Sequence, residues 1–172
     1  MLKKGERGDG MDKLAVLRQY FGFPAFRAGQ QTLIDAVLSG RDALGVMPTG
    51  GGKSLCYELP ALLLPGMTLV VSPLISLMKD QVMALRNAGI PAGCINSSMS
   101  LDELRETYRD ARYGAYKLLY VAPERLLTDG FCSLAQELEI PLVAVDEAHC
   151  ISQWGQDFRP SYLKIVEFLQ RL

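Results

Sequence analysis

The chain has 172 residues, an apolar share of 49% and a net charge of −1 from 18 basic and 19 acidic side chains. This composition is typical of one packed globular domain and excludes a disordered chain and a globally basic surface, although it allows a local DNA site. No apolar run is long enough to cross a bilayer and no apolar leader precedes the first helix. We therefore expect a cytoplasmic protein (nucleoid-associated in a bacterium) without a membrane partner. The sequence does not tell its oligomeric state.

The four cysteines, Cys56, Cys94, Cys132 and Cys150, are far apart in the sequence and are accompanied by a single histidine. Zinc sites usually combine closely spaced Cys and His ligands, so we expect no zinc within this chain. Reduced thiols in a core are the simpler interpretation.

The beginning of the chain combines a charged segment with two helical patterns. Residues 1–10 are charged, Gly-rich and without periodicity, which predicts a mobile tail. Apolar residues at helical spacing predict a helix from Met11, and an aromatic, turn-rich link follows at 21–30. A second helix is expected from Gln31 to about Gly40.

Beyond Gly40, short apolar β-branched runs alternate with helical segments. This alternation predicts an α/β fold with a mainly parallel sheet that is covered on both faces. A capping box, Ser100-x-x-Glu103, is expected to begin one of the helices, with Leu101, Leu104, Tyr108 and Ala111 facing inward. The predicted strands are 42–46, 68–72, 92–95, 117–121 and 142–146, and the predicted helices are 53–64, 74–88, 100–114, 131–138 and 162–172.

A glycine-rich loop lies between the predicted strand 42–46 and the helix after it. It reads Met-Pro-Thr-Gly-Gly-Gly-Lys-Ser, the layout of a phosphate-binding loop, although Met47 replaces the first glycine of the general pattern. Glycine lets the backbone approach an anion, Lys53 would reach the β- and γ-phosphates, and Ser54 would bind Mg²⁺. The alternative is a Gly-rich turn with an exposed lysine. The candidate nucleotide-binding residues are Met47, Pro48, Thr49, Gly50, Gly51, Gly52, Lys53 and Ser54.

Two carboxylates follow the predicted strand 142–146, in the motif Asp146-Glu147-Ala-His149. Ligands of α/β proteins bind where parallel strands end, so Asp146 could hold Mg²⁺ there and Glu147 could polarise an attacking water. His149 is close enough in sequence to sense a γ-phosphate. The alternative is a solvated Asp-Glu loop with a structural histidine.

An aromatic segment at 150–160 holds the single tryptophan of the chain, Trp154, with Phe158 and Arg159. These side chains either pack on the core or stack on the bases of single-stranded nucleic acid while the arginine meets phosphate. The residues by themselves favour neither interpretation.

Together these motifs resemble the RecQ family of DEAH-type DNA helicases, from about Leu17 onward. The segments that carry the resemblance are 47–54, 71–81 (Val-Ser-Pro-Leu-Ile-Ser-Leu-Met-Lys-Asp-Gln), 120–125 (Tyr-Val-Ala-Pro-Glu-Arg), 146–149 and 152–160 (Ser-Gln-Trp-Gly-x-Asp-Phe-Arg-Pro). The resemblance implies a RecA-like P-loop NTPase three-layer fold and an enzyme that uses ATP and Mg²⁺. It also implies that hydrolysis drives 3′-to-5′ movement on single-stranded DNA and DNA junctions, in recombination and repair.

The resemblance also implies roles for single residues. Phe23, Arg27 and Gln30 match the family's adenine-recognition segment, and segments 72–81 and 122–125 match its DNA-facing side. Gln156 stands where relatives often carry His. The residues that match the loop coupling single-strand binding to hydrolysis are Gln153, Trp154, Phe158 and Arg159.

The resemblance gives three segments: a tail at 1–10, a helix with the adenine segment at 11–30, and part of a helicase ATP-binding domain at 31–172. The family's next strand, second lobe and zinc segment have no counterpart before Leu172, so we expect an incomplete sheet, marginal stability and no unwinding by this chain alone. A truncated, non-catalytic nucleotide- or DNA-binding fragment is the alternative function. An unrelated small-molecule kinase is disfavoured because nothing resembles an acceptor site.

Overall fold

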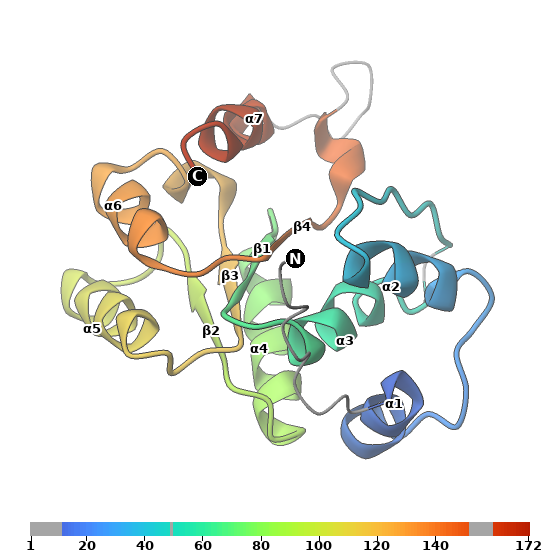
Figure 1. Cartoon of the computed structure of the whole chain (residues 1–172). Helices are drawn as coiled ribbons and strands as arrows, with labels where there is room; N and C mark the ends of the chain where they lie inside the picture. Colours follow the sequence, from blue (N-terminus) through green and yellow to red (C-terminus); the bar gives the residue numbers. More distant parts are fainter. Residues whose placement is uncertain (1–11, 49, 152–159) are drawn as a thin grey trace, which may run out of the picture. The chain divides into compact units, whose positions relative to one another are not determined.

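The computed structural model describes residues 12–48, 50–151 and 160–172, which form two compact units that meet in sequence between Leu63 and Leu64 (Figure 1). The predicted tail at 1–10 lies outside the described residues. Within the described ranges, no helix has the length and apolar character needed to span a bilayer.

Among its described residues, the first unit contains three helices, α1 (Lys13–Phe21), α2 (Gln30–Leu38) and α3 (Leu55–Leu63). Gly22 ends α1 with a φ of 71°, a left-handed conformation that glycine adopts without steric cost. The predicted helices at the start of the chain are therefore confirmed within two residues. The core of this unit is apolar and is made by Val16, Leu17, Ile34, Leu55 and Leu59.

The predicted strand at 42–46 is wrong. Residues 41–48 form neither helix nor strand, and the side chains of Leu44 and Val46 are 80% and 92% exposed. A strand is stable only when a neighbour accepts and donates its backbone hydrogen bonds, and the one sheet among the described residues takes all of its strands from the second unit. The apolar character of the segment is therefore not sufficient to form a strand.

The second unit is built on a four-stranded parallel sheet of β1 (Thr68–Val71), β2 (Ala92–Ile95), β3 (Leu118–Val121) and β4 (Leu142–Val145). Its spatial order is β2-β3-β1-β4. In register, Val71 pairs with Val121 on one side and with Val145 on the other, so these strands end at the same edge. The remaining four predicted strands are confirmed.

Helices connect the strands on the two faces of this sheet (Figure 1). The chain runs from β1 to β2 in one direction across the sheet and back to β3 and β4 in the other, and right-handed crossovers then place α4 opposite α5 and α6. The side chains of α5, α6 and α7 share a core with every second strand residue, including Leu69, Val71, Leu119 and Val121. The helices are α4 (Ile75–Asn87), α5 (Leu101–Arg112), α6 (Asp129–Glu137) and α7 (Lys164–Leu169), with short 3₁₀ turns at Pro123–Arg125, Ala148–Ile151 and Pro160–Leu163.

The predicted capping box of α5 is confirmed. The Ser100 hydroxyl accepts a hydrogen bond from the Glu103 amide at 3.2 Å, and the Glu103 carboxylate accepts one from the Ser100 amide at 2.7 Å. The predicted inward position of Leu101 is wrong, because its side chain is 72% exposed. The stripe that packs on the core begins one turn later, at Leu104.

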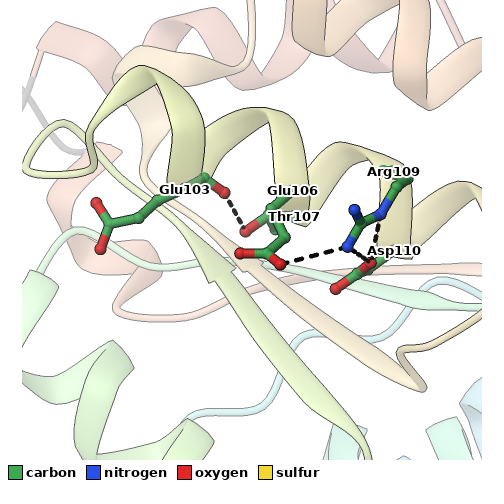
Figure 2. Close-up of polar contacts among 5 residues, drawn as sticks. All are labelled: Glu103, Glu106, Thr107, Arg109 and Asp110. Atoms are coloured by element: carbon green, nitrogen blue, oxygen red, sulfur yellow. Dashed lines mark hydrogen bonds and ion pairs between the residues drawn. The ribbon is translucent and has the colours of Figure 1, made fainter.

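The outer face of α5 carries the charged residues that Figure 2 shows. Arg109 contacts the carboxylates of Glu106 at 3.3 Å and Asp110 at 2.9 Å. Thr107 is buried, and its hydroxyl donates to the carbonyl oxygen of Glu103 one turn earlier at 2.9 Å (Figure 2). A strongly amphipathic helix of this kind is stabilised by packing on one side and remains solvated on the other.

Candidate functional site

The glycine-rich loop of the first unit leads directly into α3. The Lys53 carbonyl oxygen accepts the Cys56 amide at 3.0 Å, and the Ser54 carbonyl oxygen accepts the amides of Tyr57 and Glu58 at 3.1 and 2.9 Å, so the helical hydrogen bonds begin at Lys53 and Ser54. Gly50 and Gly52 have φ values of 75° and 77°. The loop therefore presents the start of a helix, with Lys53 and Ser54 half-buried, which is the arrangement that favours an anion.

Gln30, the first residue of α2, is tied to this loop by its side chain. Only 3% of the residue is exposed. Its Nε2 donates to the carbonyl oxygens of Gly52 at 3.1 Å and Gly51 at 3.4 Å, and its Oε1 accepts the Arg27 amide at 2.8 Å. The amide group thus links the start of α2 to the backbone of the glycine loop.

Arg27 makes a second link to the same loop. Its Nη1 donates to the carbonyl oxygen of Gly50 at 2.6 Å, and its guanidinium lies 6.0 Å from the centre of the Phe23 ring. That distance is within the range of a cation–π contact, and the planar guanidinium of arginine is well suited to stack on an aromatic ring. The structure brings Gln30 and Arg27 to the glycine loop and Phe23 to Arg27, contacts that the loop motif itself did not predict.

Met47, at the start of the loop, takes the position where the general motif has glycine. Its sulfur lies 4.0 Å from the sulfur of Cys56, on the first turn of α3. The side chain is half-buried and apolar contact with α3 therefore accounts for a residue larger than glycine at this position. Pro48 closes the turn by accepting the Gly51 amide on its carbonyl oxygen at 3.0 Å.

In the second unit, Asp146 follows β4 and is 8% exposed. Its amide donates to the Val71 carbonyl at 2.9 Å, which extends the β1–β4 pairing by one step. Its Oδ1 accepts the Glu147 amide at 3.0 Å, and its carbonyl oxygen accepts the buried Tyr162 hydroxyl at 2.8 Å. Both the backbone and the carboxylate of Asp146 are therefore held in place, and no sequence pattern had connected Tyr162 with it.

Glu147 and His149 form a contact in the turn after β4. Oε2 of Glu147 lies 3.2 Å from Nδ1 of His149, and the Glu147 carbonyl accepts the Cys150 amide at 2.9 Å. Glu147 has a φ of 50°, the left-handed region that non-glycine residues rarely adopt. Such strain is found mainly where the surroundings fix a functional side chain.

The two carboxylates can take part in binding a hard cation but do not form a complete cage. No group of three or more His, Cys, Asp or Glu side chains gathers among the described residues. Magnesium is usually held by one or two carboxylates, waters and substrate phosphates, so an almost fully buried carboxylate at a strand end fits Mg²⁺ bound together with a nucleotide. The candidate residues Thr49, Gln153, Trp154, Phe158 and Arg159, and the departure at Gln156, lie outside the described residues.

Ser72, at the end of β1, is the other polar residue that the sheet buries at this edge. Its exposed fraction is 0%, and its hydroxyl has no hydrogen-bond partner among the described residues. The resemblance had included Ser72 in a DNA-facing segment, and its burial keeps the hydroxyl away from the surface in this conformation. Asn96, at the end of β2, is equally buried, but its Oδ1 accepts both the amide and the hydroxyl of Ser98 at 2.9 and 2.7 Å.

Comparisons with known proteins agree with this geometry. The model of the DEAD/DEAH box helicase family matches residues 27–172. The chain is 55% identical over 92% of its length to "ATP-dependent DNA helicase RecQ" of Bacillus subtilis (strain 168), of which it covers 27%. It is 52% identical over 88% of its length to the protein of the same name from Haemophilus influenzae, of which it covers 25%. The chain thus spans about a quarter of the length of the curated relatives it matches.

A solved structure supports the fold. The crystal structure of a hypothetical ATP-dependent RNA helicase from Sulfolobus tokodaii superposes with a TM-score of 0.65 over 92% of this chain and 45% of that chain, at 21% sequence identity. This similarity confirms the predicted RecA-like α/β fold. The family match leads to one conclusion: the chain belongs to the DEAD/DEAH box helicase family, and the two relatives compared above are named RecQ helicases.

Proposed function

We propose that this chain is the ATP-binding part of a DNA helicase that couples ATP hydrolysis to 3′-to-5′ movement on single-stranded DNA and DNA junctions, in recombination and repair. The observation that carries the proposal is the buried Gln30 amide bonded to the carbonyl oxygens of Gly51 and Gly52. A carboxamide can pair with the edge of adenine through one donor and one acceptor, so this residue would connect the base to the loop that binds the phosphates. The names of the RecQ relatives support DNA as the second substrate.

In this proposal each part of the site has a distinct task. Lys53 and the loop amides hold the phosphates, and Arg27 and Phe23 flank the base. Ser54 in the first unit and Asp146 in the second are each proposed as Mg²⁺ ligands, and Mg²⁺ would neutralise charge on the phosphates when it is bound. Glu147, which contacts His149, would accept a proton from the attacking water.

The first experiment measures nucleotide binding with a fluorescent ATP analogue. We expect Lys53→Ala to weaken binding at least tenfold, whereas Lys164→Ala, a change at an exposed lysine of α7, leaves it unchanged. Competition with unlabelled ATP and GTP tests the base. Equal affinity of the parent and the Lys53→Ala variant would contradict a phosphate-binding role for the loop.

The second experiment tests DNA. Fluorescence anisotropy with a labelled single strand should give weaker binding for Trp154→Ala than for the parent, because base stacking on an aromatic ring contributes about 1–3 kcal/mol. Tyr113→Ala, at an aromatic side chain that is 83% exposed on the second unit, is the control. For the direction, the protein isolated from its source organism should unwind a duplex with a 3′ tail and not one with a 5′ tail.

A nucleotide-binding module without hydrolysis is the second candidate function. It is favoured by one observation, the absence of a strand at 41–48, because a phosphate loop is normally anchored by the strand that precedes it. Single-turnover ATP hydrolysis separates the two candidates. Hydrolysis that is lost in Glu147→Gln while ATP binding is retained supports the enzyme, and binding without any hydrolysis in the parent supports the module.

A further inference from the structure

The second unit leaves three buried side-chain atoms without a hydrogen-bond partner among the described residues: Thr68 Oγ1, Ser72 Oγ and Arg125 Nε. Two of these atoms are hydroxyl oxygens. Thr68 is the first residue of β1, and Ser72 directly follows its last residue. A buried hydroxyl that forms no hydrogen bond destabilises the fold, so each such group requires an explanation. For Ser72 the explanation lies in its neighbour.

The strand register places Ser72 beside Asp146. Val70 pairs with Ala144. Two positions further along the two strands, Ser72 and Asp146 are opposite each other in the same register. The bond from the Asp146 amide to the Val71 carbonyl, at 2.9 Å, continues the pairing to this step. Because strand side chains alternate between the faces, both side chains lie on the face of Val70 and Ala144, on strands roughly 4.8 Å apart.

Ligands of α/β proteins bind at the edge where the parallel strands end. β4 lies on one side of β1, whereas the chain leaves β1 towards β2 on the other side, so the carboxyl ends of β1 and β4 lie next to each other at this edge. Ser72 and Asp146 stand at these two strand ends. The hydroxyl and the carboxylate are both almost fully buried there.

We propose that Ser72 is a positioning residue for Asp146, and that its hydroxyl donates to the Asp146 carboxylate when a divalent cation and a nucleotide are bound. This inference rests on the proposed function of Asp146 as a cation ligand and adds a residue to it. A carboxylate that binds a metal is usually oriented by a further hydrogen bond, and loss of that partner weakens metal affinity about ten- to one hundredfold. In the absence of the cation, the Ser72 hydroxyl has no acceptor among the described residues. When the cation and the nucleotide bind, the Asp146 carboxylate reorients and accepts its hydrogen bond.

Thr68 provides a matched control. It lies on the same strand and the same face, is 1% exposed and has an equally unpartnered hydroxyl, but it pairs with Leu142 at the opposite edge of the sheet. Thr68→Val and Ser72→Ala each remove one unsatisfied buried hydroxyl. Any general effect of that removal on the fold is therefore common to both variants, and only Ser72→Ala removes a donor beside Asp146.

The experiment measures Mn²⁺ binding to the complex of the chain with ADP by electron paramagnetic resonance, without reference to hydrolysis. Ser72→Ala, and Ser72→Cys as a nearly isosteric second variant with a weak donor, should each raise the Mn²⁺ dissociation constant about tenfold or more. Thr68→Val should retain the parent value, and circular dichroism shows whether each variant folds.

Equal Mn²⁺ affinity of the parent and a folded Ser72 variant, or an equal loss in Thr68→Val, would overturn the inference. The proposed function fails separately, if the parent does not bind a fluorescent ATP analogue or if Asp146→Asn leaves the Mn²⁺ affinity unchanged. If the parent binds the nucleotide, and Asp146→Asn weakens Mn²⁺ binding whereas the Ser72 variants do not, the proposed function is supported and the role of Ser72 is excluded.

Discussion

The side-chain amide of Gln30 donates to the carbonyl oxygen of Gly52 across 3.1 Å, although 22 residues separate them in the sequence. The bond joins the first residue of α2 to the loop that leads into α3. Because the amide is buried, its donors and acceptor must be satisfied by the protein or by a ligand. The same group that would read a base thus fixes the loop when no base is present.

The first prediction concerns Gln30. Gln30→Ala leaves the Gly51 and Gly52 carbonyls and the Arg27 amide without this partner, so we expect the free energy of unfolding to fall by roughly 1–3 kcal/mol. We also expect ATP affinity to fall and the preference for ATP over GTP to decrease. Urea unfolding and competition binding measure these effects. Gln31→Ala, at the exposed neighbouring position, is the control and should change neither.

The second prediction compares two glycines with nearly the same backbone conformation. Gly52 and Gly40 have φ values of 77° and 74°, so an alanine at either position costs roughly 1–2 kcal/mol of backbone energy. A Cβ on Gly52 would also lie 2.5 Å from Nε2 of Gln30, whereas nothing lies within 4 Å of a Cβ on Gly40. Gly52→Ala should therefore destabilise more and should also weaken nucleotide binding. Equal thermal shifts and equal ATP affinity for the two variants would contradict this.

The third prediction concerns the hydroxyl behind Asp146. Tyr162→Phe removes the donor to the Asp146 carbonyl oxygen and leaves it buried, which should cost about 1–3 kcal/mol of stability. Because the change also loosens the backbone of Asp146, Mn²⁺ affinity should fall although no ligand is removed. Tyr113→Phe, on an exposed ring, should be neutral in both measurements. A Tyr162→Phe variant with parental stability would show that the bond makes no contribution.

The fourth prediction concerns the capping box and pH. The pKa of Glu103 is lowered because its carboxylate accepts a backbone hydrogen bond from Ser100. A lowered folded-state pKa means that the contribution of Glu103 is complete above the ordinary glutamate pKa of about 4.3 and is lost as the pH falls through the folded-state value. The stability difference between the parent and Glu103→Ala, from urea unfolding, should therefore shrink between pH 7 and pH 3 (roughly the range that spans these values). Glu106→Ala, on the same helix, controls for the loss of a surface carboxylate.

The elements whose formation depends on nearby residues were predicted from the sequence. The capping box at Ser100 and the helix after the glycine loop follow from hydrogen bonds and periodicities within a few residues, and the four strands of the sheet were recognised as short apolar runs. The strand expected at 42–46 was wrong because strand formation depends on a partner strand, which can be far away in the sequence. Leu101 was placed inward because its spacing from Leu104 is helical, but spacing does not say where a core ends.

The candidate site divides in the same way. Lys53 and Asp146 could be located from motifs, because each motif states its own chemistry. The bonds from Gln30 to Gly52 and from Tyr162 to Asp146 cross 22 and 16 residues, and nothing in the local pattern marks either pair. The proposed role of Ser72 could not be predicted from the local sequence either, because it depends on burial beside a carboxylate of another strand.

At Glu147 the backbone conformation and the chemistry favour different residues. Glycine would adopt a φ of 50° without steric cost, so Glu147→Gly would relieve strain and lose the carboxylate that contacts His149. Directed evolution for thermal stability alone would then favour glycine, whereas selection for hydrolysis would keep glutamate. A library randomised at Glu147 and sorted separately by these two criteria would yield different residues, and the difference would measure how much stability the site gives up for its chemistry.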